Sequence, residues 1–302
     1  MSFYLNGNTI GDMYVGGTKV GEAWLNGQKV YSSVPPFVGI KYIFRDIDAD
    51  GNLTKATGAL ENASKITQIG YYGLYSAFPY CPGLTGSVSF PNLTSIGDHG
   101  LFNAFSHCTG LTGSISFPKL TSIDYQGLGN TFKNCTGLTG SVSFPNLTSI
   151  GDSGLYTTFE NCTGITGISF PKLTSIDWGG LSNAFSGCSG LTGSISFPNL
   201  PSIGPAGFDS AFSGCTGITG ISFPKLTAID ASGLVRAFYK CTGLTGSISF
   251  PNLTTIEISG LNNAFFGCTG ITEVHFKSSL SGNSQCTSSN MGCTNATVFF
   301  DL

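Results

Sequence analysis

A cysteine recurs at a nearly fixed interval through most of this chain. The eight copies from Cys81 to Cys268 are separated by 27, 27, 27, 26, 27, 26 and 27 residues, and they are Cys81, Cys108, Cys135, Cys162, Cys188, Cys215, Cys241 and Cys268. A fixed period of this size is typical of a solenoid, in which each repeat is one structural unit stacked on the next. The segment "GCTNATVFF" echoes the sequence around Cys268, so Cys293 is a ninth copy in a shortened, capping repeat.

One part of each repeat predicts a short strand. The phrase "SVSFP" alternates polar and apolar residues, so Val88 and Phe90 are expected to point inward and Ser89 outward. Equivalent residues of a solenoid stack above one another, about 4.8 Å apart. The outward serines should therefore form one polar row, composed of Ser89, Ser116, Ser143, Ser169, Ser196, Ser222 and Ser249.

The part that ends at the cysteine predicts a short helix. In the fourth copy, the apolar positions Leu155, Thr158, Phe159 and Cys162 follow i, i+3, i+4 and i+7 spacing, which is one face of a helix. An aspartate often precedes this part and would cap the helix; the examples are Asp124, Asp177 and Asp230. The predicted fold is therefore an α/β solenoid of about nine turns, with a short strand and a short helix in each turn.

The repeated cysteines are expected to be reduced core thiols, because a small, weakly polar group fits a stacked interior position. Disulfides between neighbouring repeats are the alternative, but stacked side chains point the same way, which is poor disulfide geometry. Cys286 also falls at an inward position of the cap. The sequence has no C-x-x-C pair and three histidines, so a metal site is not expected.

The repeat wording "GLxxAFxxCxGLTGSISFPxLTSI" resembles the bacterial leucine-rich repeats of the BspA-like class, also called the TpLRR class. The resemblance covers residues 60–302. It implies a curved leucine-rich repeat solenoid with strands along one face. It also implies adhesion or protein–protein contact, and no catalysis.

The first residues hold a different, ten-residue pattern. Tyr4, Tyr14 and Trp24 are each followed by Asn-Gly or Gly-Gly, which is typical of two-residue hairpin turns. We expect an antiparallel β module over residues 1–33, and a linker with a further hairpin over residues 34–59. The phrase "YVGGTKVGEAWLNGQKVY" resembles short N-terminal attachment modules of tailed-phage tail and fibre proteins.

"DIDADGNL" in the linker resembles the start of a calcium loop. Thr57 stands where that loop needs a bidentate acid, and Asp50-Gly51 suits a hairpin turn, so the hairpin is the favoured interpretation.

Composition argues against several classes of function. Charged residues make up 10 % of the chain and the net charge is −3, so nucleic acid is not an expected partner. No apolar run approaches the ~20 residues of a membrane span. His99, His107 and His275 lie at different repeat phases and share no nucleophile, so neither an enzyme nor a cofactor is expected.

Two functions compete. The first is a phage virion protein of the tail or fibre type, which attaches to other virion proteins through the N-terminal module. Its solenoid would bind a host surface protein or glycan. The start "MSFYLNGNTIGDMY" lacks the basic and apolar segments of a secretory signal, which fits assembly in a host cytoplasm. The alternative is a bacterial cell-surface adhesin of the BspA-like class; a purely structural decoration protein and a homo-oligomer are also open.

Large aromatic residues that differ between copies mark a candidate binding strip. They are Tyr71, Tyr75, Phe102, Tyr125, Tyr156 and Trp178, with Tyr125, Tyr156 and Trp178 as its expected centre. Exposed tyrosine and tryptophan are favoured anchors at interfaces. The competing interpretation is lateral packing between neighbouring helices. If the strip is not the site, the serine row becomes the better candidate.

Overall fold

The computed structural model describes residues 66–302 in full and, before them, only the backbone of six short strands. These strands are β1 Phe3–Leu5, β2 Asn8–Ile10, β3 Trp24–Leu25, β4 Gln28–Lys29, β5 Phe44–Ile47 and β6 Leu53–Thr57. They pair antiparallel as β1–β2, β3–β4 and β5–β6. The attachment module predicted for residues 1–33 and the linker predicted for residues 34–59 otherwise lie outside the described residues.

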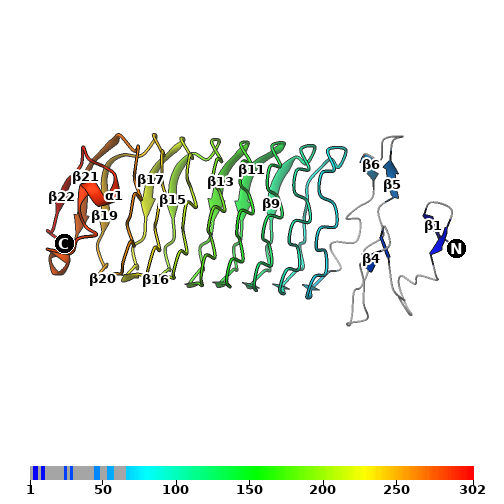
Figure 1. Ribbon diagram of the computed structural model, residues 1–302, viewed down its shortest axis with the longest axis horizontal. Coiled ribbons are helices and arrows are strands. Elements are labelled where there is room, and N and C mark those ends of the chain that lie inside the picture. Colours follow the sequence, from blue (N-terminus) through cyan, green and yellow to red (C-terminus); the bar gives the residue numbers. More distant parts are fainter. Residues whose placement is uncertain are drawn as a thin grey trace.

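Residues 66–302 form a solenoid whose repeats stand side by side in one row (Figure 1). We number the repeats 1–9 by their cysteines, from Cys81 to Cys293. Each of repeats 1–8 has a short strand before its cysteine: β7 Gln68–Ile69, β8 Ser95–Ile96, β10 Ser122–Ile123, β12 Ser149–Ile150, β14 Ser175–Ile176, β16 Ser202–Ile203, β18 Ala228–Ile229 and β20 Thr255–Ile256. The strands that follow the cysteines are β9 Gly113–Ser116, β11 Leu138–Ser143, β13 Ile165–Ser169, β15 Gly193–Ser196, β17 Ile218–Ser222, β19 Thr245–Phe250, β21 Gly270–Phe276 and β22 Thr297–Phe299. The predicted solenoid of about nine turns is confirmed.

Neighbouring repeats pair in parallel, and the isoleucine and serine positions lie opposite their own copies. The register shifts near the glycine of the longer strands, where Gly140 pairs with Ile165. Ile123 lies between Ile96 and Ile150, and Ser143 lies between Ser116 and Ser169. The serines of this row are exposed or half-buried, as the alternation predicts.

A proline interrupts one of the sheets. The short strands β7, β8, β10, β12 and β14 form one five-stranded sheet, and β16, β18 and β20 form another. Pro201 stands at the break, where repeat 5 has Thr174, whose N–H donates to the carbonyl oxygen of Thr148 at 2.9 Å. Proline has no N–H, so this inter-repeat hydrogen bond cannot form there.

The predicted helix in each repeat is wrong. The segment that ends at each cysteine is a series of tight turns, with a left-handed residue at every fourth position, such as Gln126 (φ 49°), Asn130 (φ 54°) and Asn134 (φ 58°). Asp124, Asp177 and Asp230 therefore cap no helix. Within residues 66–302 the helices are η2 Ser278–Leu280 and α1 Ser288–Met291.

Hydrogen bonding explains why the turns replace a helix. Alternate N–H groups donate locally, as Thr131 N does to Leu128 O at 3.1 Å. The N–H groups between them donate to the next repeat, as Phe132 N does to Thr158 O at 2.9 Å. A helix would place all its backbone bonds inside one short segment, which is marginally stable alone. The stacked turns instead share half of their bonds with a neighbour.

Two columns of phenylalanine rings fill the core. One column contains Phe78, Phe105, Phe132, Phe159, Phe185, Phe212, Phe238 and Phe265, with ring centroids 5.3–5.8 Å apart. The other runs from Phe90 through Phe117, Phe144, Phe170, Phe197, Phe223 and Phe250 to Phe276. Leu155, Thr158, Phe159 and Cys162 are all buried, although they do not lie on a helix.

An alternating pattern of asparagine and lysine links the repeats on the surface. Lys119 Nζ donates to Asn92 Oδ1 at 2.7 Å, and Lys172 Nζ donates to Asn146 Oδ1 at 2.7 Å. Asn146 Nδ2 in turn donates to the carbonyl oxygen of Pro118 at 2.7 Å. Alternation therefore keeps one lysine from stacking directly on another.

The C-terminal cap continues the ladder of turns. Asn263 N donates to Asn290 O at 2.7 Å, and Phe265 N donates to Met291 O at 2.8 Å. Helix α1 thus accepts the bonds that a further repeat would accept. Cys286 and Cys293 are buried in this cap. In residues 66–302, no helix is long and apolar enough to cross a membrane.

Candidate ligand-binding surface

The repeated thiols are structural hydrogen-bond donors. Cys135 Sγ donates to Phe105 O, one repeat earlier, at 3.0 Å, and burial raises the pKa of Cys135 to about 12. Six other cysteines make the same bond at 3.0 Å: Cys108, Cys162, Cys188, Cys215, Cys241 and Cys268. A thiol that stays protonated is a poor nucleophile and metal ligand. In residues 66–302, the cysteines form no disulfide and no group of His, Cys, Asp or Glu is arranged to hold a metal.

Aromatic side chains gather on the surface of repeats 1–3. Tyr72 stacks on His99 with ring centroids 4.7 Å apart, and Tyr75 stacks on Phe102 at 5.3 Å. Tyr71 contacts Tyr72 edge to face at 4.4 Å. We call these residues, together with Tyr125, the aromatic cluster: Tyr71, Tyr72, Tyr75, His99, Phe102 and Tyr125.

His99 joins the members of the cluster. Its ring lies 5.6 Å from Phe102 and 5.1 Å from Tyr125, in addition to the stack on Tyr72. Gly129 occupies the next position of the Tyr75–Phe102 column. A Cβ atom on Gly129 would lie 2.8 Å from Phe102 Cδ2, so glycine makes room for the phenylalanine ring. Repeat 3 therefore has no ring at this position, and the exposed Tyr156 occupies it in repeat 4.

A second feature runs along repeats 1–5. The residue ten positions before each cysteine alternates between an aromatic and an aspartate, and we call this set the platform row: Tyr71, Asp98, Tyr125, Asp152 and Trp178. Its aromatic side chains are 75 %, 44 % and 59 % exposed, in that order. Both aspartates are exposed as well.

The aspartates hold the following aromatic residues by their backbone. Tyr125 N donates to Asp98 Oδ1 at 3.2 Å, and Trp178 N donates to Asp152 Oδ1 at 3.0 Å. In residues 66–302, no side chain bonds the second oxygen of either carboxylate. Carboxylate and aromatic groups thus alternate along one exposed line.

Comparison with known proteins settles the class of this solenoid. The family model described as "BspA type Leucine rich repeat region" matches residues 67–209 and 234–298, in six copies. The chain belongs to this family of BspA-type leucine-rich repeat proteins. No curated protein sequence matches it significantly.

Two solved structures of leucine-rich repeat proteins resemble this BspA-type chain. A leucine-rich cell surface protein from Faecalibacterium prausnitzii A2-165 is 19 % identical, with 89 % of this chain and 95 % of that chain covered and a TM-score of 0.27. The T. pallidum leucine-rich repeat protein is 15 % identical, with 88 % and 82 % covered and a TM-score of 0.35. Scores this low carry no information about the ligand.

The BspA-type solenoid brings some of the predicted binding residues together. Tyr71, Tyr75, Phe102 and Tyr125 belong to one cluster. Tyr156 and Trp178 are exposed, but no aromatic ring of residues 66–302 contacts either of them. Lateral contacts between rings therefore occur within the cluster, whereas Tyr156 and Trp178 make no contact with another aromatic ring of residues 66–302.

Sequence reasoning missed Tyr72 and His99. In a helix, Tyr71 and Tyr75 would lie on one face, and Tyr72 would lie on a different face. Both missed residues have left-handed backbone, with φ of 54° and 55°, which turns their side chains into the cluster. Their position, one residue after each member of the platform row, is the signal that identifies them once the turns are known.

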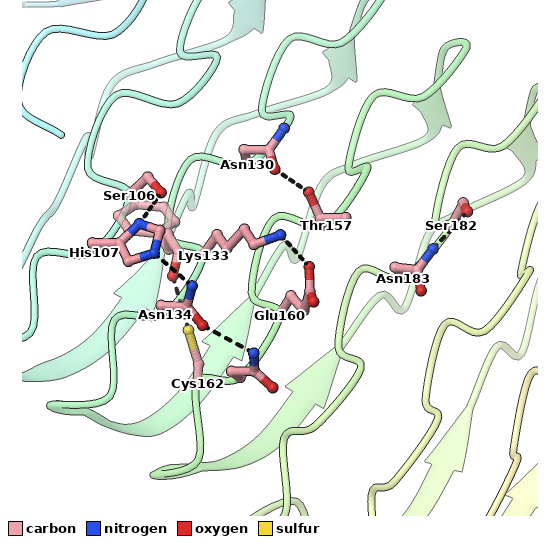
Figure 2. A network of polar contacts seen from close by, with 12 residues as sticks. Ser106, His107, Asn130, Lys133, Asn134, Thr157, Glu160, Cys162, Ser182 and Asn183 are labelled. Carbon is pink, nitrogen blue, oxygen red and sulfur yellow. Dashed lines mark hydrogen bonds and ion pairs between the residues drawn. The ribbon is translucent and has the colours of Figure 1, made fainter. Parts of the chain in front are cut away.

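Polar side chains of the turn segments contact one another in repeats 2–4 (Figure 2). Asn134 Nδ2 donates to His107 Nε2 at 2.8 Å, and the opposite ring nitrogen of His107 donates to Ser106 Oγ at 2.8 Å. Burial, with Lys133 nearby, lowers the pKa of His107. Lys133 Nζ pairs with Glu160 at 2.8 Å, and Thr157 donates to Asn130. These groups satisfy one another between repeats, so we assign them to stacking of the solenoid.

Proposed function

We propose that this protein is an adhesive binding protein that uses the exposed aromatic surface of repeats 1–5 to hold a molecule on a cell surface. The observation that carries the proposal is the aromatic cluster of repeats 1–3, followed by the exposed Tyr156 and Trp178 in repeats 4 and 5. Contiguous exposed apolar surface is typical of interaction sites, and tyrosine and tryptophan are frequent anchors there. The partner is a surface protein or glycan, and binding proceeds without catalysis, a cofactor or nucleic acid.

The family favours a bacterial cell-surface adhesin, the alternative in the sequence analysis, over a phage tail or fibre protein. The match concerns the solenoid alone. The phage interpretation depends on the N-terminal module, whose side chains lie outside the described residues. On this proposal the protein acts at the bacterial surface, and the solenoid faces the molecule that it binds.

Cell binding tests the proposal. We would label the full chain with a fluorophore and measure its binding to a panel of bacterial and host cells by flow cytometry. Substitution of Tyr125, Tyr156 and Trp178 by serine should abolish binding and leave the melting temperature within a few degrees. A matched control replaces Ile258 and Phe266, exposed apolar residues of repeat 8, by serine. Equal binding by the triple variant and the wild-type chain would remove the aromatic surface as the site.

A further inference from the structure

The spacing of the platform row suggests the class of ligand. Tyr71, Tyr125 and Trp178 each lie two residues after a short strand of the five-stranded sheet, namely β7, β10 and β14. Successive residues of this sheet pair directly, from Ile69 through Ile96, Ile123 and Ile150 to Ile176. Neighbouring strands lie about 4.8 Å apart, so the aromatic platforms recur about every 9.6 Å.

Extended β-1,4-linked glycans have a matching period. Successive sugars in such a chain are turned over, so every second sugar presents the same face on the same side. The length of that disaccharide unit is close to two strand spacings of a sheet. The axial C–H groups of a pyranose ring form a flat apolar face that stacks on tyrosine or tryptophan. Three platforms two repeats apart can therefore contact the first, third and fifth sugars of one chain.

The aspartates suit the sugars between the platforms. Asp98 and Asp152 lie in the intervening repeats, and each has one carboxylate oxygen engaged by a backbone N–H. The second oxygen is available to accept hydrogen bonds from sugar hydroxyl groups. Bonds to a charged acceptor are stronger than bonds between neutral groups.

Other polymers fit this row less well. A single nucleic acid strand also stacks on aromatic rings, but its phosphates would be repelled by Asp98 and Asp152 and by a net charge of −3. A protein partner commonly covers about 800 Å² on each side with an apolar centre. In the platform row, exposed aromatic rings alternate with carboxylates at Asp98 and Asp152, which suits a hydroxyl-rich chain better than an apolar interface centre.

We propose that the platform row binds an extended β-1,4-linked glycan, with alternate sugars stacked on Tyr71, Tyr125 and Trp178. Hydroxyl groups of the intervening sugars donate to Asp98 and Asp152. This inference deepens the proposed function, on which it rests, by naming the ligand class and the residues that set its spacing.

Calorimetric titration of the full chain with purified oligosaccharides tests the inference. The probes are β-1,4-linked glucose and N-acetylglucosamine oligomers of two to six units, with α-1,4-linked maltohexaose as the control. Affinity should rise mainly from two to three units and from four to five, because each step reaches one more platform. Each gain should be about tenfold, comparable with the lower end of the range for nucleic acid bases that stack on aromatic side chains. Maltohexaose should not bind, because its chain is curved.

Substitutions then test the residues. Trp178→Ser should reduce the affinity for the pentasaccharide to that of the trisaccharide, and no ring contact among residues 66–302 is lost by this change. Ile258→Ser is the matched control, because Ile258 occupies the same phase in repeat 8, is 77 % exposed and should leave affinity unchanged. Asp98→Asn should weaken binding without changing the length dependence.

The outcomes separate the two proposals. If the labelled chain binds cells through its aromatic surface but no β-1,4 oligomer binds, the glycan inference fails and the adhesive function stands. Equal affinity for maltohexaose and the β-1,4 hexamers would also overturn the inference, because the spacing would then not be used. If neither cells nor oligomers bind, both proposals fail.

Discussion

The thiol of Cys162 donates to the carbonyl oxygen of Phe132 in the preceding repeat at 3.0 Å. That same carbonyl accepts a bond from the backbone N–H of Cys135 at 3.0 Å. The cysteine is therefore repeated for two reasons: its size fits the interior, and its S–H group donates a bond between repeats. Alanine supplies neither.

The first prediction concerns this bond. Cys162→Ala should lower the free energy of unfolding by about 1–3 kcal/mol, because a buried donor is lost and a small void remains. Chemical denaturation of both proteins measures the difference. Thr163→Ala, at an exposed neighbouring position, is the control and should change stability by less than about 0.5 kcal/mol. Equal effects from the two substitutions would show that the bond is unimportant.

The redox state of the cysteines is a second prediction. Burial raises the pKa of Cys135 and Cys188 to about 12, so the thiols of the folded protein should react very slowly with a thiol reagent at neutral pH. After denaturation without reductant, the reagent should count ten free thiols. A count near zero would mean that the cysteines are oxidised and that the stacked geometry is misassigned.

The phenylalanine column makes a third prediction. Phe159 is fully buried between Phe132 and Phe185, at centroid distances of 5.4 and 5.3 Å, so Phe159→Ala should cost about 3–5 kcal/mol. Phe78, in repeat 1, is only partly buried and has one ring neighbour in this column. Phe78→Ala should cost less, because coupling in a solenoid passes between adjacent repeats. The reverse order in denaturation experiments would contradict this account.

A pH-dependent contribution to stability is expected at the C-terminal cap. His275 Nδ1 lies 2.9 Å from Asp301 and Nε2 lies 3.3 Å from Glu273, and these carboxylates raise the pKa of His275 above its ordinary value of 6.5. The folded state therefore binds this proton more tightly than the unfolded state does. Its stabilisation is fully present below pH 6.5 and is lost as the pH rises through the folded pKa.

Melting temperatures of the wild-type protein and His275→Gln check the pH prediction. The difference between them should be largest at mildly acidic pH and should shrink as the pH rises. His107 has a lowered pKa and contributes in the opposite sense, losing stability on acidification, so the paired comparison is needed to isolate His275. A difference that grew with pH would contradict the assignment.

The strands and the core could be predicted from the sequence because the spacing of their apolar residues is compatible with only one simple structure. Alternation in "SISF" predicts which face of the strand is buried, and the nearly constant period predicts that equivalent serines and isoleucines of neighbouring repeats pair. The segment before Cys135 was harder, because buried residues at i, i+3, i+4 and i+7 satisfy a helix and a ladder of turns equally well. Asn130 and Asn134, four residues apart, are the distinguishing signal, since asparagine tolerates the left-handed backbone that the turns require.

The candidate site was only partly predictable for the same reason. Tyr71, Tyr75 and Tyr125 can be recognised in the sequence, because they are large aromatic residues at positions that vary from one repeat to the next. The contact of His99 with Tyr72 depends on a backbone conformation that a helical spacing does not contain. The hydrogen bond from Asn134 to His107 could not be predicted either, because the sequence alone does not show which side chains face the next repeat.

The alternation of asparagine and lysine between repeats has an evolutionary consequence. Lys119 and Lys172 stand in the repeats that carry Tyr125 and Trp178, whereas Asn92 and Asn146 stand in those that carry Asp98 and Asp152. An in-frame duplication of two adjacent repeats leaves every lysine beside an asparagine at both new junctions. Duplication of a single repeat would instead place two lysines, or two asparagines, in adjacent repeats. Duplications of two repeats can thus lengthen this protein while every lysine keeps an asparagine in the adjacent repeat. Each such pair copied from repeats 2–5 adds one aromatic side chain and one carboxylate to the platform row.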